Sequence, residues 1–229
     1  MHVVLSVGGS QVSTENGIDR SFLENLRKLL EKSDYHFGIV VGGGNAARKY
    51  ADKVRAKGGN EFEADEAAIQ ATKENAKAVI NALGKMAYGK VCTDFNEARM
   101  QAKKHRIVVM GGTIPGITTD ADAALLAEAL GAKRLVNISN VEGVYDSDPK
   151  KNPQAKKFNR MGYHQLIHAA CEYDQRRAGE NFVFDILACK LIARSKLETH
   201  FVNGKKVGDI MAALDGKRHS GTVVKTQKT

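Results

Sequence analysis

Hydrophobic positions along the chain fall into short apolar runs that alternate with longer amphipathic stretches. The apolar runs predict strands at 3–7, 39–41, 106–110, 135–139, 198–202 and 222–224. Apolar residues at helical spacing predict helices at 19–32, 46–54, 65–83, 94–104, 121–130, 162–172, 185–195 and 208–214. Strands that alternate with helices indicate an α/β fold, a three-layer αβα sandwich around a mostly parallel sheet.

The remaining pattern bears on domain organisation. Residues 140–157 are polar and hold two of the three prolines, which predicts a long loop. The sequence contains no fixed-period repeat, no low-complexity segment and no linker that would separate two domains. We therefore expect one α/β domain over residues 1–229, with an N-terminal lobe over about 1–130 and a C-terminal lobe over about 131–229.

Three predicted strands end abruptly in glycine clusters, which we call the glycine junctions. They lie at Gly8–Gly9–Ser10, at Gly42–Gly44 and at Gly111–Gly112–Thr113. Residues without side chains expose backbone N–H groups, and the helix that follows directs its positive end toward them. In a parallel sheet such strand ends share one edge. The junctions thus predict a site for several phosphate groups.

Composition narrows the classes of partner. The net charge of +9 favours anionic ligands, yet the chain has no Trp, 6% aromatic residues and no recognisable nucleic-acid motif, so we expect no nucleic-acid partner. Cys92, Cys171 and Cys189 lack the spacing of a zinc site or a disulfide framework, which leaves no metal site held by the protein. No apolar stretch is long enough to span a bilayer and no signal peptide is recognisable, so we expect a cytoplasmic protein without a membrane partner.

Two common nucleotide-binding motifs fit poorly. The P-loop pattern GxxxxGK[ST] is absent. The relaxed dinucleotide pattern GxGxxA fits residues 42–47, but Asp65, the acid at the expected distance, opens a predicted helix instead of ending a strand. The third junction is more specific, because Thr113, Thr118 and Thr119 place three hydroxyls beside glycine backbone. Asp120 and Asp122 follow these hydroxyls, and they could order Mg²⁺ or cap the next helix.

Four motifs in fixed order carry a family resemblance. They are GGS at 8–10, GGG with an arginine four residues on at 42–48, GGTxPGxTTDAxAALLAE at 111–128 and SNVEGVYDSDPK at 139–150. The chain resembles the amino-acid kinase family, and within it the compact archaeal type that acts on UMP. The resemblance runs from Val3 to about Val224, and residues 187–195 and 221–224 also match it.

This resemblance implies an activity and its requirements. It implies transfer of the ATP γ-phosphoryl group to UMP, which gives UDP and ADP in pyrimidine nucleotide biosynthesis. Mg²⁺ would accompany ATP, the acceptor would bind to the N-terminal lobe and ATP to the C-terminal lobe. The resemblance also implies a homo-hexamer, a trimer of dimers.

The resemblance also assigns residues by position. Three residues would act in catalysis: Arg48, Asn140 and Asp185. The ATP site would comprise Gly9, Ser10, Gly44, Arg48, Ser139, Asn140, Tyr145 and Asp148. The UMP site would comprise Gly43, Asp65, Thr113, Ile114, Pro115, Gly116, Ile117, Thr118 and Thr119.

The chain departs from the family pattern at a few positions. Most family members have a lysine two residues before the first glycine pair, where it meets the transferring phosphoryl group, but Ser6 stands here, as it does in archaeal relatives that lack this lysine. Three basic residues are candidates for the compensating charge: Arg48, Lys49 and Lys150. Ser139 replaces a usual threonine and keeps its hydroxyl, and Ile186 replaces the proline after Asp185.

Two alternatives to a UMP kinase stay open. One is another kinase of the same fold that acts on a small phosphate or carboxylate acceptor. An isopentenyl phosphate kinase would need a histidine near the second glycine junction, and none lies between Phe37 and Lys104. The other is a nucleotide-binding module that has lost phosphoryl transfer, which Ser6 in place of lysine keeps open.

Overall fold

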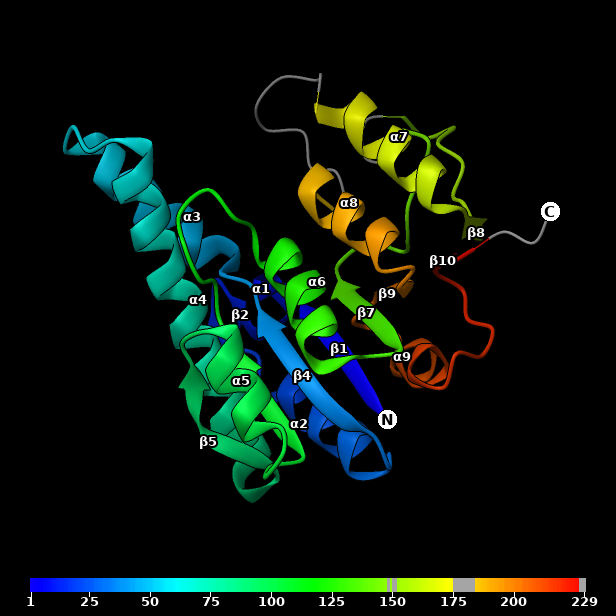
Figure 1. Ribbon diagram of the computed structural model, residues 1–229. Coiled ribbons are helices and arrows are strands. Elements are labelled where there is room, and N and C mark those ends of the chain that lie inside the picture. Colours follow the sequence, from blue (N-terminus) through cyan, green and yellow to red (C-terminus); the bar gives the residue numbers. More distant parts are fainter. Residues whose placement is uncertain (148, 150–151, 175–183, 227–229) are drawn as a thin grey trace.

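One sheet of eight strands organises the computed structural model of this chain, and the strand order is β5-β6-β4-β1-β7-β9-β10-β8 (Figure 1). The structure describes residues 1–147, 149, 152–174 and 184–226. The strands pair in parallel except that β10 runs antiparallel to β9. The strands of the sheet are β1 (His2–Val7), β4 (His36–Val41), β5 (Ala87–Cys92), β6 (Ile107–Met110), β7 (Arg134–Ser139), β8 (Arg160–Met161), β9 (Glu198–Asn203) and β10 (Thr222–Val224), and β2 (Ser13–Thr14) with β3 (Gly17–Ile18) forms a separate hairpin.

Helices cover both faces of the sheet, as the sequence predicts for an αβα sandwich. One face packs against α5, α6, α7 and α8, and the other against α1, α2, α4 and α9, while α3 lies on α4 (Figure 1). The helices are α1 (Gly9–Val12), α2 (Arg20–Glu31), α3 (Gly44–Ala56), α4 (Glu61–Leu83), α5 (Phe95–Gln101), α6 (Thr119–Leu130), α7 (Tyr163–Asp174), α8 (Ile186–Arg194), α9 (Val207–Leu214) and the short 3₁₀ helix η1 (Gly84–Met86).

The period of two along each strand creates the two halves of the core. On β1, Val3, Leu5 and Val7 point into the half beneath α2, α4 and α9. Val4 points into the half beneath α6 and α8. Both sets are fully buried, which is why the central strands are apolar on both faces. The buried sheet therefore holds the strand ends, and the loops that follow them, in fixed positions.

Side-chain caps set where the helices begin. Asp19 accepts a hydrogen bond from Phe22 N at 2.9 Å and starts α2 where the sequence predicts it. Asn60 and Glu63 form a reciprocal capping box, so α4 begins at Glu61 rather than at the predicted residue 65. Asp65 consequently lies in the second turn of α4 and does not open the helix.

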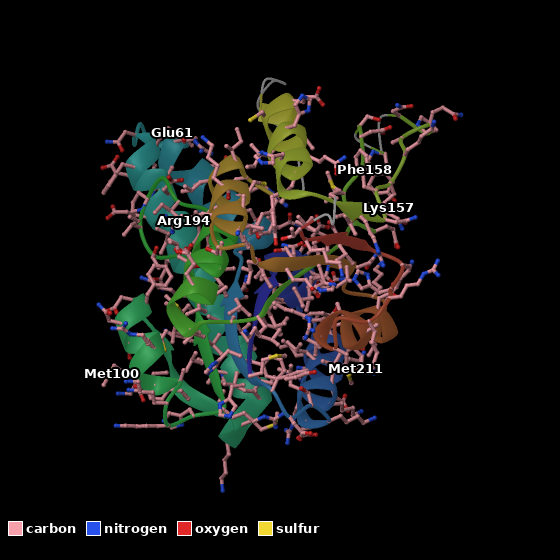
Figure 2. The ribbon with its side chains drawn as sticks, turned by 45° about the vertical axis from the view of Figure 1, so that its right-hand side comes forward. Glu61, Met100, Lys157, Phe158, Arg194 and Met211 are labelled. Atoms are coloured by element: carbon pink, nitrogen blue, oxygen red, sulfur yellow. The ribbon has the colours of Figure 1, made fainter. Side chains whose placement is uncertain are left out.

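The sequence pattern missed several elements. Strand β5 was not predicted, because Gly89 and Lys90 leave its middle exposed and interrupt the apolar run. The two-residue strand β8 was also not predicted, and α5 ends at Gln101, before the predicted residue 104. Within the predicted loop 140–157, Tyr145 forms an isolated antiparallel bridge with Lys157, which is labelled in Figure 2. Among the described residues, no helix combines the length and the apolar composition needed to cross a bilayer.

Candidate active site

The three glycine junctions meet at one edge of the sheet, as the strand-end argument predicts. They follow β1, β4 and β6, which are neighbours in the sheet. A Cβ atom at Gly44 would lie 2.7 Å from Gly9 C and from Ser10 N, and Gly44 has a φ of +60° that favours glycine. A Cβ atom at Gly42 would lie 2.9 Å from Gly9 N. The first two junctions therefore touch backbone to backbone, with no room for side chains between them.

Two buried polar side chains of α4 form hydrogen bonds with the backbone of the second and third junctions. Asn75 Nδ2 donates to Gly42 O at 2.8 Å and to Gly43 O at 3.3 Å. Thr72 Oγ1 accepts from Gly112 N at 2.6 Å. Neither residue was recognised from the sequence, although polar residues on the apolar face of a predicted helix were a usable signal. Through Thr72 and Asn75, α4 fixes the second and third junctions relative to each other.

The third junction continues into a loop, residues 113–119, that several side chains pin down. Thr113 donates from its backbone N at 3.1 Å and from its hydroxyl at 2.6 Å, both to the Asp122 carboxylate. Gly116 N donates to Asp65 Oδ2 at 2.8 Å. Thr118 caps α6 by accepting from Ala121 N at 3.2 Å. Asp65 is therefore brought to the loop with which the resemblance groups it.

The remaining residues of this loop differ in exposure. Ile114 is 55% exposed, which is unusual for a large apolar side chain. Pro115 and Ile117 are half-buried. Thr119 begins α6, and its side chain reaches both the second junction at Gly42 and the third at Gly112. The loop thus presents apolar and hydroxyl groups beside the glycine backbone.

Three carboxylates gather behind the junctions. Asp120 Oδ1 accepts from Ser6 Oγ at 2.8 Å and from Asn137 Nδ2 at 3.2 Å. Loss of hydration, with the charge of Asp185 nearby, raises the pKa of Asp120 to about 7. Burial likewise raises the pKa of Asp122 to about 6. The sequence had given both residues only a capping or Mg²⁺-ordering role.

Asp185 joins this cluster from the other half of the chain. Its Oδ1 accepts from Ala188 N at 2.9 Å, so it caps α8 in spite of the isoleucine that follows it. Its Oδ2 accepts a hydrogen bond from the Thr118 hydroxyl. Asp185 therefore links α8 to the loop 113–119.

The residues assigned to ATP lie around the ends of β1 and β7. Ser139 Oγ is buried and has no hydrogen-bond partner within the described structure. Gly8 N donates to Ile138 O at 2.9 Å, which seats the first junction on β7. A buried hydroxyl without a partner is costly, and a ligand group at this strand end would relieve that cost.

Further along, the assigned ATP residues are less tightly held. Asn140 is exposed, and Tyr145 is half-buried and bridges to Lys157. Ser10 is half-buried in α1. Asp148 lies outside the described residues, so the structure does not place it.

In the described part of the chain, no basic side chain forms a hydrogen bond with Ser6 or a hydrogen bond or ion pair with Asp120. Arg48 is exposed on α3 and donates to Asn45 Oδ1 in the turn that follows the second junction. Lys49 is exposed on the same helix, and Lys150 lies outside the described residues. Arg48 is therefore the candidate cation that lies closest in sequence to a junction.

The described residues contain no group of three or more His, Cys, Asp or Glu side chains arranged to hold a metal ion. Mg²⁺ keeps several of its waters and is commonly held by substrate phosphates with one or two carboxylates. Asp120 and Asp185 are carboxylates of this kind at the junction edge. The donor set therefore suits a Mg²⁺ ion that arrives with a nucleotide.

Comparison with known families identifies the family to which the chain belongs. A sequence model of the amino acid kinase family matches residues 1–203. The chain belongs to the amino acid kinase family. Within it the chain is similar to the uridylate kinase of Thermococcus kodakarensis, with 44% identity over 226 residues, 98% of this chain and 99% of that protein. It is also similar to the uridylate kinase of Archaeoglobus fulgidus, with 42% identity over 224 residues, 98% of this chain and 100% of that protein.

Solved structures share the fold of this chain. The crystal structure of the Archaeoglobus fulgidus uridylate kinase superposes with a TM-score of 0.86 at 42% identity and covers 98% of this chain and 100% of that chain. The UMP kinase of Bacillus anthracis superposes with a TM-score of 0.81 at 20% identity, covering 99% of this chain and 96% of that chain. This second likeness shows the shared fold alone.

Proposed function

We propose that this chain is a UMP kinase, which transfers the γ-phosphoryl group of ATP to UMP and forms UDP and ADP. The observation that carries the proposal is the meeting of the three glycine junctions beside the loop 113–119, which Asp65 holds through Gly116 N. Backbone N–H groups at such an edge favour phosphates, and two phosphate-bearing substrates have to meet there. Similarity over nearly the full length to archaeal uridylate kinases supports UMP as the acceptor.

The acceptor side of the proposed site belongs to the N-terminal lobe, residues 1–130. Gly43 and the loop residues Thr113, Ile114, Pro115, Gly116, Ile117, Thr118 and Thr119 would surround UMP. Asp65 Oδ2 already accepts from Gly116 N, which leaves its other oxygen for the ribose hydroxyls. A carboxylate that accepts from a ribose diol favours ribonucleotides over deoxyribonucleotides.

The ATP side of the proposed site belongs to the C-terminal lobe, residues 131–229, together with the first two junctions. Gly9, Ser10 and Gly44 would face the phosphates, and Ser139, Asn140, Tyr145 and Asp148 would line the nucleotide. The unpartnered Ser139 hydroxyl supports this assignment, because a nucleotide group would supply the bond that the protein does not.

Phosphoryl transfer asks the protein mainly for alignment and for charge stabilisation. Arg48 would supply positive charge from α3, and Asn140 a hydrogen bond to ATP. Asp185 would position Thr118, which donates to it, and so orient the acceptor loop. Bound Mg²⁺ would neutralise part of the phosphate charge, and Asp120 or Asp185 would order its water ligands.

The wider setting is part of the same proposal. UDP formation would serve pyrimidine nucleotide biosynthesis, and we infer a cytoplasmic enzyme because all three cysteines are free thiols.

We also infer a homo-hexamer, a trimer of dimers, from the family resemblance. Light scattering coupled to size exclusion would give the mass directly. A monomer of 24.9 kDa would contradict the hexamer and leave the catalytic proposal unaffected.

A substrate panel tests the proposed function. ADP formation from ATP and Mg²⁺ is measured with UMP, CMP, isopentenyl phosphate, glutamate, aspartate and carbamate as separate acceptors. We expect turnover with UMP and none with the carboxylate acceptors. Turnover only with another acceptor would establish a different kinase of the same fold. Binding of ATP and UMP without turnover would establish a nucleotide-binding module, the alternative that Ser6 in place of lysine keeps open.

A further inference from the structure

A hollow lies on the sheet face that α9 partly covers, away from the glycine junctions. Met161 on β8 and Val224 on β10 point into the core on the opposite face. Their neighbours Arg160 and Val223, which are partners in the parallel β8–β10 ladder, therefore point the other way. The hollow over these strands has a volume of about 770 Å³, a size that suits a metabolite. It shares no residue with the glycine junctions or with the loop 113–119.

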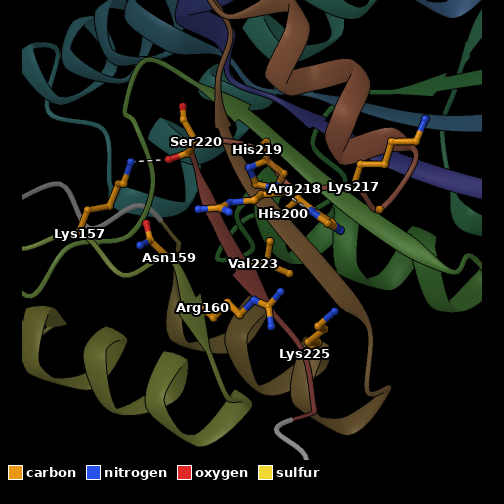
Figure 3. Close-up of a pocket in the computed structure, with 11 residues that line it drawn as sticks. Lys157, Asn159, Arg160, His200, Lys217, Arg218, His219, Ser220, Val223 and Lys225 are labelled. Atoms are coloured by element: carbon orange, nitrogen blue, oxygen red, sulfur yellow. Dashed lines mark hydrogen bonds between the residues drawn. The ribbon is translucent and has the colours of Figure 1, made fainter.

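Basic side chains dominate the wall of this hollow, which we call the basic pocket (Figure 3). Among the described residues that line it, none is acidic. Its cationic residues are Lys157, Arg160, Lys217, Arg218 and Lys225.

Two of these cations are already engaged. Lys217 Nζ lies 2.8 Å from Asp215 Oδ2 and points away from the others in Figure 3. Lys157 donates to the backbone oxygen of Ser220. Arg160, Arg218 and Lys225 have no side-chain ion pair or hydrogen bond within the described chain. In Figure 3, Arg160 and Lys225 lie together beyond Val223, and Arg218 lies beside the two histidines.

The histidines form a fixed, neutral part of the wall. His200 is 1% exposed and shares a 2.8 Å hydrogen bond with His219 and a 2.9 Å hydrogen bond with Glu198. Burial lowers the pKa of His200 to about 4 and lowers that of His219, with the charge of Lys157 acting in the same direction on His219. Glu198 in turn pairs with Arg134 at 3.1 Å. Its charge is therefore already paired and does not neutralise the three unpaired cations.

We propose that the basic pocket binds a small compound carrying two or more phosphate groups. Three unpaired cations around one hollow repel each other, and a multiply charged anion would relieve that repulsion. Arginine forks bind phosphate oxygens in pairs, which favours phosphate over a single carboxylate. The described residues that line the pocket include no Phe, Tyr or Trp, so they do not form the aromatic stacking surface of a single-stranded nucleic-acid site.

The proposal goes beyond the proposed function, because UMP and ATP are assigned to the strand ends. The test uses a reporter inside the pocket. Inorganic tripolyphosphate is titrated into the full-length chain while the imidazole signals of His219 are followed by NMR, with the signals assigned through His219→Gln. The exposed His164 and His168 on α7 serve as internal references. A phosphate compound at the junction edge would leave the His219 signals unchanged.

The variant Arg160→Gln, Arg218→Gln, Lys225→Gln removes the three unpaired cations. Its control is Lys85→Gln, Lys103→Gln, Lys104→Gln, which removes the same charge from exposed positions near β5 and β6. We expect a saturable His219 shift in the unchanged protein, a loss of affinity of about 10-fold or more in the pocket variant, and a change within about 2-fold in the control. The single variant Arg218→Gln, at an exposed position in the irregular segment between α9 and β10, gives the same reading if the triple variant does not fold.

Three outcomes would overturn the proposal. The first is an unmoved His219 signal at millimolar tripolyphosphate. The second is an equal loss of affinity in the pocket variant and its control, which would assign the effect to net charge. The third is tighter perturbation of His219 by a short RNA or DNA oligonucleotide than by tripolyphosphate, which would make the pocket a nucleic-acid surface. Because no arm measures phosphorylation of UMP, failure of the kinase proposal would leave these readings intact.

Discussion

Ser6 Oγ donates a hydrogen bond of 2.8 Å to Asp120 Oδ1, across 114 residues of sequence. The family resemblance leads us to expect a lysine at this position in most of the wider family, so Asp120 receives a hydroxyl where that pattern would place a cation. A neutral partner stabilises a carboxylate less than a charged one does. Burial raises the pKa of Asp120 to about 7, and the neutral hydroxyl of Ser6 offsets only part of that rise.

The Asp120 pKa predicts how stability depends on pH. Its folded value of about 7 exceeds the ordinary value of 3.8, so between these values the folded chain binds more protons than the unfolded chain. The free energy of unfolding should therefore fall as pH rises from about 4 to about 7 and then level off. Asp120→Asn should reduce this slope and gain about 1 kcal/mol or more over the unchanged protein at about pH 8.

Urea unfolding at several pH values checks this. Part of the slope should remain in Asp120→Asn, because the pKa of Asp122 is also raised, to about 6. Asp34→Asn, at an exposed position, is the matched control and should keep the full slope. A slope that is the same in Asp120→Asn and in the control would show that folding does not raise the pKa of Asp120.

Gly9→Ala should damage both stability and nucleotide binding. Its Cβ atom would overlap the backbone of Gly43 and Gly44. We expect a loss of about 1–3 kcal/mol in the free energy of unfolding, the usual range for overpacking. Gly208→Ala on α9 is the control, because its Cβ atom meets nothing within 4 Å. Thermal unfolding with and without ATP would check both, and a Gly9→Ala protein as stable as the control would contradict the contact between the loops.

Asn75→Leu should destabilise the second junction. The change removes the amide that donates to Gly42 O at 2.8 Å and leaves buried carbonyls unpaired. We expect a cost of about 1–3 kcal/mol by urea unfolding. Asn81→Leu, on the exposed side of the same helix, should stay within about 0.5 kcal/mol of the unchanged protein. Equal effects of the two substitutions would mean that Asn75 contributes no more than an exposed residue.

Asp65→Ala should act on the acceptor alone. It removes the oxygen that accepts from Gly116 N at 2.8 Å, and also the one proposed for the ribose. We expect the KM for UMP to rise about 10-fold or more and the KM for ATP to stay within about 2-fold. Asp65→Asn keeps an oxygen for Gly116 N, so its KM for UMP should lie between that of the unchanged protein and that of Asp65→Ala. Steady-state kinetics in both substrates would decide, and equal changes in the two KM values would remove Asp65 from the acceptor site.

Arg48→Ala should lower turnover more than Lys49→Ala does. Arg48 is held by Asn45 beside the second junction, and it is the described cation that the resemblance assigns to ATP. Loss of one charge-stabilising donor commonly costs about 100-fold in kcat. Turnover at saturating ATP and UMP is the measurement, with Lys150→Ala as a third arm. An unaffected rate removes the residue concerned as the substitute for the missing lysine.

The central sheet and the meeting of the junctions could be predicted from the sequence. Buried parallel strands appear as apolar runs, and their carboxyl ends all lie at the same end of the sheet. Strand β5 could not, since an edge strand with exposed Gly89 and Lys90 has no such run. The supports Thr72 and Asn75 could not be assigned either, because a polar residue on a helix shows its partner only once the loops are folded against it. The bond from Ser6 to Asp120 was invisible for the same reason: both residues were noticed, but separately.

The contact between Gly9 and Gly44 joins two loops that are distant in sequence into one rigid unit. Because their backbones touch, neither the first nor the second junction can shift without displacing the other. Chimeras made between this chain and its relatives must therefore inherit residues 8–10 and 42–44 from the same parent. A recombination point placed between these loops would combine a first junction from one parent with a second junction from another, and the two backbones would not have evolved in contact.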